Sequence, residues 1–413
     1  MNRHTELRIL VLDDEPFMLK LLARLLANQG FTRVVTSDNG PSALAMVADE
    51  TTAPQLILCD LNMPEMDGVE FVRALVDHGY RGSLILVSGE DERTLQSARK
   101  LVQAHHINVL GTLQKPVSPP MLTRLIEQWV PAVLAPDRLP QKKYAADQLA
   151  QAIQQGELVN YYQPKVSVAS GEVVGVETLV RWHHPQDGTV FPDEFIGLAE
   201  SSGLIDALTE AVLVQALRDA AAWSQRDLSL KVAVNVSVDN LTTLEFPEMV
   251  TAHARSAGVA AQSVVLEVTE SRLMQDLRTP LDILTRLRLR RFHLSIDDFG
   301  TGHSSLAQLR DAPFNELKID RGFVHGAHSN GTNRAIFMAS LHLAKELGME
   351  VVAEGVEDQA DWDFLKETGC DLAQGYFIAR PMPASKLVLW MDAWKERCSA
   401  ENPDRLSAPG ISP

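Results

Sequence analysis

Short apolar runs alternate with helical spacing along residues 1–128 of the chain. Five of these runs have the length of buried strands, and they span residues 7–12, 33–36, 55–59, 84–87 and 107–113. After the first run, Met18, Leu22 and Leu25 recur at helical spacing, and Gly30 ends the helix. Strands that alternate with helices in this way predict an α/β fold with a doubly wound sheet of five parallel strands.

Eight further strand-like runs lie within residues 148–396. They span residues 159–168, 173–182, 231–237, 264–269, 292–298, 316–319, 350–353 and 371–377. Helical patterns separate most of them, which predicts a (β/α)8 TIM-like barrel. Only residues 169–172 separate the first two runs, and a parallel crossover needs a dozen residues or more. We therefore expect a hairpin there, with one barrel strand antiparallel to the others.

Proline residues mark the segments outside the two domains. Residues 129–147 contain Pro131, Pro136 and Pro140, which block helix continuation and predict a semi-rigid linker with a short helix starting near Ala145. Residues 397–413 are also proline-containing, and we expect this tail to be disordered.

The composition excludes some classes of protein. The formal net charge of −16 argues against direct DNA binding, which needs a basic surface. An anionic substrate remains compatible, because bound metal ions can invert the local field. The three cysteines are widely spaced, the first residues lack the apolar core of a signal peptide, and no apolar run has the length of a membrane span. These features predict a cytoplasmic protein.

Polar residues stand at the strand ends of the first domain: Asp13, Asp14, Asp60, Ser88 and Lys115. The carboxyl ends of strands in a doubly wound sheet converge on one site. Three carboxylates can bind one Mg²⁺, while a lysine and a hydroxyl contact a phosphoryl group, so the set predicts phosphoryl transfer onto a carboxylate. Each residue alone is equally compatible with a helix cap, a turn or a solvated side chain; the whole set favours function.

A second polar set follows the strands of the barrel. It comprises Glu177, Arg181, Asn235, Glu267, Glu270, Asp297, Asp298, Lys318, Glu354 and Gln374. Barrel enzymes carry their catalytic groups at this end of the strands. Oxygen ligands suit Mg²⁺ or Mn²⁺, and two such ions a few ångströms apart are the arrangement for in-line phosphodiester hydrolysis. Any single carboxylate could instead cap a helix.

The first domain resembles the receiver domain of response regulators in the segments VLDDEP, LCDLNMPEMDG, VSG and QKP. The resemblance implies a flavodoxin-like fold, phosphorylation by a cognate sensor histidine kinase, and one Mg²⁺ ion. Asp60 would be the phosphoacceptor, Asp13 and Asp14 would hold the ion with it, and Ser88 and Lys115 would sense the phosphoryl group. The family usually has an aromatic switch residue at the position of Thr112.

The second domain resembles the EAL-domain family of cyclic-di-GMP phosphodiesterases. The segments that carry the resemblance are YQPKV, VETLVRW, NVS, LEVTE, IDDFGTGHSSL, LKID, VAEGVE and AQGYFIARPMP. The family implies hydrolysis of one phosphodiester bond of cyclic di-GMP to give linear pGpG. Two positions depart from the family pattern: Thr178 stands in the middle of the naming triplet, and His303 replaces a tyrosine.

The resemblance also implies two ions of Mg²⁺ or Mn²⁺ in the barrel. Glu177, Asn235, Glu267 and Asp297 match the ligands of the first ion. Asp297 and Asp298 match those of the second, with Asp297 bridging. Glu177 therefore counts among the catalytic residues.

Other family positions imply roles around these ions. Glu354 matches the general base or water-orienting residue, and Lys318 would hold the attacking water or stabilise developing charge. Gln374 would support the metal–water network, and Gln163 and Arg181 would bind the nucleotide. One further residue lies outside the metal set: Glu270, which would anchor the loop of residues 299–305.

The main hypothesis is a response regulator whose output is phosphorylation-regulated cyclic-di-GMP hydrolysis. The alternative is a degenerate EAL domain that acts as a cyclic-di-GMP receptor or protein-interaction module. A third interpretation has the receiver domain as an unphosphorylated scaffold. We also expect a homo-oligomer, by analogy with both families.

Overall fold

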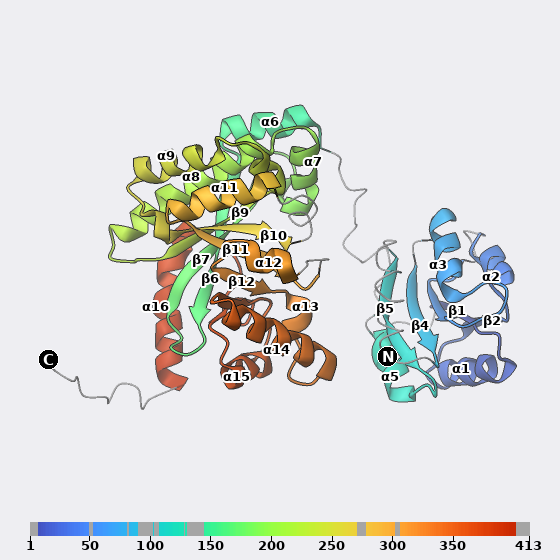
Figure 1. Cartoon of the computed structure of the whole chain (residues 1–413). Helices are drawn as coiled ribbons and strands as arrows, with labels where there is room; N and C mark the ends of the chain where they lie inside the picture. Colours follow the sequence, from blue (N-terminus) through green and yellow to red (C-terminus); the bar gives the residue numbers. More distant parts are fainter. Residues whose placement is uncertain are drawn as a thin grey trace. The chain divides into compact units, whose positions relative to one another are not determined.

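The chain forms two compact units, residues 1–141 and 142–413. Figure 1 shows the computed structural model. It describes residues 7–48, 53–80, 82–89, 102, 107–127, 129, 144–270, 278–301 and 306–401.

The first unit is a five-stranded parallel sheet in the order β2-β1-β3-β4-β5. Its strands are β1 (Arg8–Leu12), β2 (Arg33–Ser37), β3 (Leu56–Asp60), β4 (Ser83–Ser88) and β5 (Asn108–Gln114). The described helices are α1 (Pro16–Asn28), α2 (Gly40–Val47), α3 (Gly68–Asp77) and α5 (Pro119–Glu127). Every residue of β3 and β4 is buried, as expected for central strands covered on both faces. The predicted doubly wound sheet is confirmed.

The local sequence explains where these helices begin. Pro16 stands at the first turn of α1, where its missing N–H costs nothing. Asp67 caps α3, because its carboxylate accepts from the backbone N–H groups of Val69 and Glu70 at 2.8 Å each. Asp13 and Asp14 therefore lie in the short connection between β1 and α1.

The second unit is a closed barrel of eight strands. They are β6 (Leu158–Ser167), β7 (Val173–His184), β9 (Lys231–Val236), β10 (Val264–Thr269), β11 (His293–Phe299), β12 (Glu316–Ile319), β13 (Glu350–Ala353) and β14 (Leu372–Ala373). Strand β6 closes the barrel by pairing antiparallel with both β7 and β14, while the remaining neighbours pair parallel. The predicted hairpin and the single antiparallel strand are confirmed. Two short strands, β8 (Gly188–Val190) and β15 (Met382–Pro383), extend the sheet.

Helices surround the barrel strands (Figure 1). The α-helices are α6 (Ala146–Gln155), α7 (Ile196–Ser201), α8 (Ile205–Ser224), α9 (Phe246–Ala257), α11 (Arg278–Leu289), α12 (Leu306–Asp311), α13 (Arg321–Val324), α14 (Gly331–Glu346), α15 (Gln359–Thr368) and α16 (Ala384–Glu401). Three 3₁₀ turns are η1 (Pro192–Glu194), η2 (Val238–Thr242) and η3 (Ala261–Ser263). The apolar faces of helices and strands form one continuous core. Several charged and amide side chains are buried inside the barrel.

Two boundaries differ from the sequence prediction. The last barrel strand is expected over residues 371–377 but ends at Ala373, because the chain bends at Gly375 and Ile378 N–H donates to the Gly375 carbonyl in a turn. Helix α16 continues to Glu401, so the first residues of the segment expected to be disordered are helical. The rest of that tail, and most of the predicted linker, lie outside the described residues.

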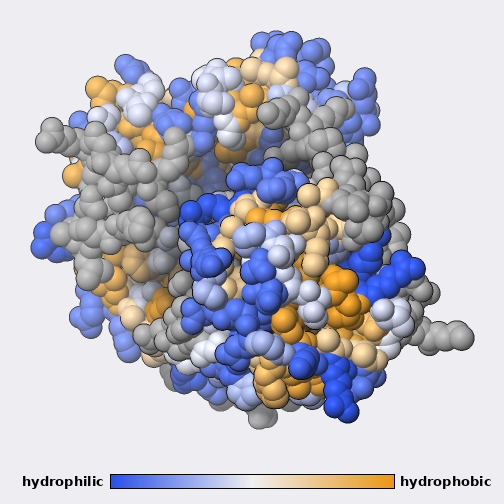
Figure 2. Space-filling model, turned by 90° about the vertical axis from the view of Figure 1, so that its right-hand side faces the viewer, coloured by the Kyte–Doolittle hydropathy of each residue, from blue (hydrophilic) through white to orange (hydrophobic). Residues whose placement is uncertain are grey.

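The surface alternates between polar and apolar areas. Figure 2 shows hydrophilic residues interspersed with smaller hydrophobic areas on the face it displays. Exposed large apolar side chains include Phe17, Val35, Leu289 and Leu389. Within the described ranges, none of the helices combines the length and the apolar character that a membrane crossing requires.

Candidate active site

Four strands of the barrel direct charged side chains into its interior. Glu177 lies on β7, Glu267 on β10, Asp297 on β11 and Lys318 on β12. Their apolar strand neighbours pack outward into the core, because successive side chains on a strand face opposite sides. The exposed fractions of these four residues are 6%, 1%, 8% and 1%, so the charged cluster is buried inside the barrel.

The Lys318 ammonium lies at the centre of four carboxylates. Its Nζ is 2.6 Å from Glu354 Oε1, 3.1 Å from Glu267 Oε2, 3.1 Å from Asp297 Oδ1 and 3.5 Å from Glu177 Oε2. Glu354 directly follows β13, so it reaches the same point from the next strand of the barrel. Residues far apart in the sequence therefore meet at one position.

Two amides hold Glu177 in place. Asn235 Nδ2 donates to Glu177 Oε1 at 3.0 Å, and Gln374 Nε2 donates to Glu177 Oε2 at 2.5 Å. Gln374 Nε2 also lies 3.0 Å from Gln163 Oε1, and Gln163 Nε2 donates to the Ala379 carbonyl at 3.0 Å. Gln163 is thus a buried support for Gln374, and its predicted contact with the nucleotide stays a prediction.

The segment after β11 changes direction sharply. Asp298 has a φ of 55°, and its backbone N–H donates to Asp297 Oδ1 at 2.9 Å. Gly300 follows with a φ of 97°, a conformation that favours glycine. Its N–H donates to Glu270 Oε2 at 2.8 Å, which ties this turn to the end of β10. Residues 302–305 lie outside the described part of the chain.

Burial and charge pull the pKa values of the cluster in opposite directions. Burial raises the pKa of Glu354 well above its usual range, and it raises that of Glu177 despite the nearby Lys318. Burial and the adjacent Asp297 raise the pKa of Asp298 to about 6. Burial disfavours ionisation of Glu267, but Lys165 and Lys318 lower its pKa to about 2.

The donor set fits divalent cations. One ligand atom from each of Glu177, Glu267 and Asp297 lies within 4.8 Å of the others, and the same holds for Asp297, Asp298 and Glu354. Hard cations of this kind prefer such oxygen ligands. Gln374 Oε1 is buried without a hydrogen-bond partner among the residues that the structure describes. A group bound next to it would satisfy this oxygen.

The formal charge of the barrel interior supports the same conclusion. The acidic members are Glu177, Glu267, Asp297, Asp298, Glu316 and Glu354, and the basic members are Lys165 and Lys318. When all six carboxylates are ionised, as cation binding requires, the two ammonium groups leave a formal charge of −4 among these residues. Divalent cations would balance a charge of this size, and buried charge is stable only when it is paired.

Arg181 lies on the same face of β7 as Glu177, four residues further along the strand. Its guanidinium is 5.7 Å from the ring centre of Tyr161 and 5.0 Å from that of Phe191. Partial burial lowers its pKa. The two aromatic rings therefore orient a cation near the mouth of the barrel.

The first unit contains a separate acidic site. Lys115 Nζ is 2.9 Å from Asp13 Oδ2 and 2.9 Å from Asp60 Oδ2, and oxygens of Asp13, Asp14 and Asp60 lie within 4.8 Å of one another. Burial raises the pKa of Asp60 in spite of Lys115. Ser88 ends the neighbouring strand β4 and is fully buried. The five predicted residues are therefore brought to one edge of the sheet.

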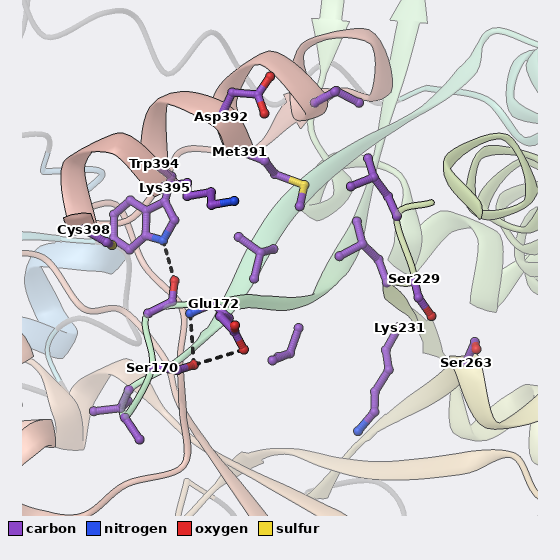
Figure 3. Close-up of a pocket in the computed structure, with 18 of the residues that line it drawn as sticks. Ser170, Glu172, Ser229, Lys231, Ser263, Met391, Asp392, Trp394, Lys395 and Cys398 are labelled. Atoms are coloured by element: carbon purple, nitrogen blue, oxygen red, sulfur yellow. Dashed lines mark hydrogen bonds between the residues drawn. The ribbon is translucent and has the colours of Figure 1, made fainter. Parts of the chain in front are cut away.

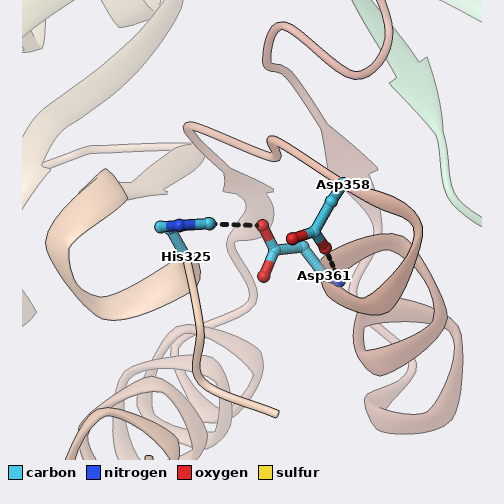
Figure 4. Close-up of side chains that lie close together, drawn as sticks. All are labelled: His325, Asp358 and Asp361. Atoms are coloured by element: carbon cyan, nitrogen blue, oxygen red, sulfur yellow. Dashed lines mark hydrogen bonds and ion pairs between the residues drawn. The ribbon is translucent and has the colours of Figure 1, made fainter. Parts of the chain in front are cut away.

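Another acidic cluster, near α13, has a structural explanation. Asp361 is fully buried beside His325 and Asp358 (Figure 4). It accepts from the N–H groups of Gly326 at 2.9 Å and Glu357 at 3.1 Å. Its Oδ2 also lies 2.8 Å from Nδ1 of His325, and Asp358 accepts from the Asp361 N–H at 2.9 Å. Asp361 thus fastens α13 to the segment that follows β13.

A cavity of about 900 Å³ lies at the opposite end of the barrel, where strands β7, β9 and β10 begin (Figure 3). Its lining includes Gly171, Leu230, Trp362, Met391 and Trp394. Barrel enzymes place their chemistry at the other end of the strands, so we do not assign catalysis to this cavity.

Sequence reasoning missed two residues of the barrel interior, Lys165 and Glu316. Lys165 stands two positions after Gln163, on the same face of β6, and that spacing was the available signal. Of the two departures from the family pattern, Thr178 is buried on the outward face of β7, behind Glu177. His303 lies outside the described residues.

Comparison with known proteins places both units in families. The family model for the EAL domain matches residues 146–381, and the model for the response regulator receiver domain matches residues 9–127. The chain belongs to the EAL-domain family and carries an N-terminal receiver domain. It is 33% identical to cyclic di-GMP phosphodiesterase RocR of Pseudomonas aeruginosa, over 92% of this chain and 97% of RocR.

Other relatives share mainly the EAL domain. Cyclic di-GMP phosphodiesterase NbdA of Pseudomonas aeruginosa is 41% identical, over 62% of this chain but only 33% of NbdA. The solved structure of the PaMucR phosphodiesterase in complex with c-di-GMP is 40% identical, covers 58% of this chain and 98% of that chain, and has a TM-score of 0.56. The EAL enzyme Bd1971, bound to cAMP and cyclic di-GMP, covers 73% of this chain and 76% of its own, at 27% identity and a TM-score of 0.58.

Proposed function

We propose that the barrel hydrolyses one phosphodiester bond of cyclic di-GMP to give linear pGpG, and that the receiver domain regulates this activity. One observation supports the proposal most: carboxylates from three strands and the segment after β13 meet around Lys318 with a charge deficit that two divalent cations would balance. RocR, which is similar over nearly its whole length, is a cyclic di-GMP phosphodiesterase.

Two ions of Mg²⁺ or Mn²⁺ would bind here. Glu177, Asn235, Glu267 and Asp297 would hold the first, and Asp297 and Asp298 the second. When bound, such ions neutralise phosphate charge and lower the pKa of water. The buried carboxylates of the cluster repel one another when ionised, and bound cations would offset that repulsion.

The protein's own groups then position the substrate and move the proton. Arg181 binds a phosphate or base through its guanidinium, which Tyr161 and Phe191 hold near the barrel mouth. Glu354, whose pKa burial raises, accepts the proton of the attacking water. Lys318 lies 2.6 Å from Glu354 and stabilises the charge that develops as the bond breaks.

Asp60 would be the phosphoacceptor of the receiver domain, with Asp13 and Asp14 holding a further Mg²⁺ ion. Lys115 already contacts Asp60 and Asp13, so it is placed to neutralise a phosphoryl oxygen. A sensor histidine kinase would supply the phosphoryl group. Association of the chain with itself remains part of this proposal by analogy alone.

The test is turnover of pure cyclic di-GMP by the full chain with Mn²⁺ or Mg²⁺, with the products separated by chromatography. We expect pGpG from the wild type and none above background from Glu177→Ala. A control variant is Glu172→Ala, an exposed-turn glutamate at the opposite end of β7, which should leave turnover unchanged. Tight binding of cyclic di-GMP without turnover in the wild type would instead support a receptor.

A further inference from the structure

Lys165 is a fully enclosed charge that the proposed reaction does not use. It lies on β6 inside the barrel, and only 4% of it is exposed. Its ammonium donates to Glu267 Oε1 at 2.6 Å and to Glu316 Oε1 at 2.9 Å. Burying an ammonium group costs free energy that its ion pairs must offset, so these two contacts identify what Lys165 holds in place.

Lys165 and Lys318 divide the two oxygens of Glu267 between them. Oε1 receives the Lys165 hydrogen bond, while Oε2 faces the carboxylate cluster, 3.1 Å from Lys318 Nζ. Lys165 holds Oε1 at 2.6 Å on the side of Glu316, whereas Oε2 lies on the side of Lys318 and the other carboxylates, so Oε2 is the oxygen placed to contact a cation. We propose that Lys165 is a positioning residue that keeps Glu267 a one-oxygen ligand and thereby sets which cation the barrel accepts. This inference rests on the cation site of the proposed function.

A second layer of contacts fixes Lys165 in this position. Glu316 Oε1 also accepts from the Ser295 hydroxyl at 2.8 Å, and Ser295 and Glu316 are partners in the register of β11 and β12. Glu316 is 4% exposed and Ser295 is fully buried. Because Glu316 balances the lysine charge, Lys165 can hold Glu267 without leaving its own charge uncompensated.

The number of oxygens that a carboxylate offers discriminates between ions. Mg²⁺ demands near-ideal octahedral geometry and takes single carboxylate oxygens, and Mn²⁺ shares its preference for octahedral oxygen sites. Ca²⁺ is larger, takes more ligands, and accepts both oxygens of one carboxylate. A Glu267 restricted to one oxygen therefore favours the smaller ions, and releasing its second oxygen favours Ca²⁺.

The experiment compares Mn²⁺ and Ca²⁺ dissociation constants by calorimetry on the full chain. All variants carry Asp13→Asn and Asp14→Asn, which remove two of the three carboxylates of the receiver site. The test variant is Lys165→Met with Glu316→Gln, which removes one charge of each sign. The matched control is Glu316→Gln alone, which leaves Lys165 on Glu267.

We expect the test variant to shift the ratio of the two constants toward Ca²⁺ by about tenfold, the scale on which outer contacts of metal ligands act. The control should keep the wild-type ratio. A purely structural role of Lys165 would lower the melting temperature but leave this ratio unchanged, and that result would overturn the inference. A second pair, Lys165→Leu with Glu316→Met, gives the same comparison if the first pair does not fold, because apolar replacements of buried ion pairs are often tolerated.

The outcome also separates this inference from the proposed function. A wild type that binds Mn²⁺ and hydrolyses cyclic di-GMP, with an unshifted ratio in both pairs, overturns the role of Lys165 alone. A wild type that binds neither ion in the barrel overturns both.

Discussion

At the scale of single residues, two lysines determine how the buried carboxylates behave. Glu267 contacts both Lys165 and Lys318, and its pKa falls to about 2. Glu354 contacts Lys318, yet burial outweighs that contact and its pKa rises. The first therefore remains an anion that can bind a cation, and the second has the affinity for protons that a general base needs.

Thr178 departs from the pattern of the EAL-domain family, and substituting it tests the effect of that departure. Its hydroxyl is buried on the outward face of β7 and has no hydrogen-bond partner within the described ranges. We expect Thr178→Val, which has nearly the same shape, to raise the free energy of unfolding by about 1 kcal/mol, because it removes an unsatisfied polar group. Denaturant unfolding and turnover assays check this. Unchanged turnover is expected, and a large loss of turnover would show that Thr178 acts on the site.

His325 provides a pH-dependent prediction. The hydrogen bond with Asp361 raises the pKa of His325 above its usual value of about 6.5. A group whose pKa is higher in the folded state stabilises that state fully below the unfolded pKa and loses this contribution as the pH rises through the folded pKa. Asp358, Glu357 and His328 also lie near this pair.

We therefore expect His325→Gln to lower the melting temperature of the second unit at about pH 6 and to have a smaller effect at about pH 8.5. The effect should be modest, since the side chain is 43% exposed. His342→Gln, an exposed position on α14, is the control. A variant effect that grows with pH would contradict the sign of the shift.

At the scale of elements, the segment after β13 carries Glu354, the proposed general base, and is held at both ends. Glu354 is followed by Gly355, whose φ is +65°, and an added Cβ there would lie 2.2 Å from Cγ of Arg321. Asp361 secures the other end through the Glu357 N–H. The position of Glu354 thus depends on a tight fit against α13.

Gly355→Ala tests that fit. We expect it to reduce both turnover and stability, because the left-handed backbone costs about 1–2 kcal/mol and the clash adds to that cost. The control is Gly348→Ala, where φ is +70° but an added Cβ meets nothing within 4 Å. Gly348→Ala should lose stability by the backbone cost alone and retain turnover per folded molecule. Equal turnover in the two variants would contradict the fit.

Sequence patterns predicted elements better than they predicted contacts. The alternation of apolar runs predicted both sheets, and the short gap at residues 169–172 predicted the antiparallel strand, because both features depend on local spacing in the sequence. The length of β14 was wrong, since the chain bends at Gly375 into a turn instead of continuing the strand. Lys165 was missed for a different reason: its partners lie 102 and 151 residues away, and an isolated lysine resembles a solvated one.

At the scale of the whole molecule, the chain joins a receiver domain to an EAL-domain barrel. If phosphorylation of Asp60 regulates the barrel, a small phosphodonor such as acetyl phosphate should change the rate of cyclic di-GMP turnover in the wild type. The same donor should not change the rate of Asp60→Ala, which keeps Asp13 and Asp14. Parallel rate measurements with and without the donor check this prediction. Equal responses in the two proteins would indicate that the receiver domain acts only as a scaffold.

The most direct test of the central claim is anomalous diffraction from crystals of the full chain soaked with Mn²⁺ and cyclic di-GMP. We predict two Mn²⁺ peaks in the barrel, one among Glu177, Asn235, Glu267 and Asp297 and one beside Asp297 and Asp298, with a phosphate of the dinucleotide next to both. A barrel with no peak at these carboxylates, or with the dinucleotide bound elsewhere, would contradict the account.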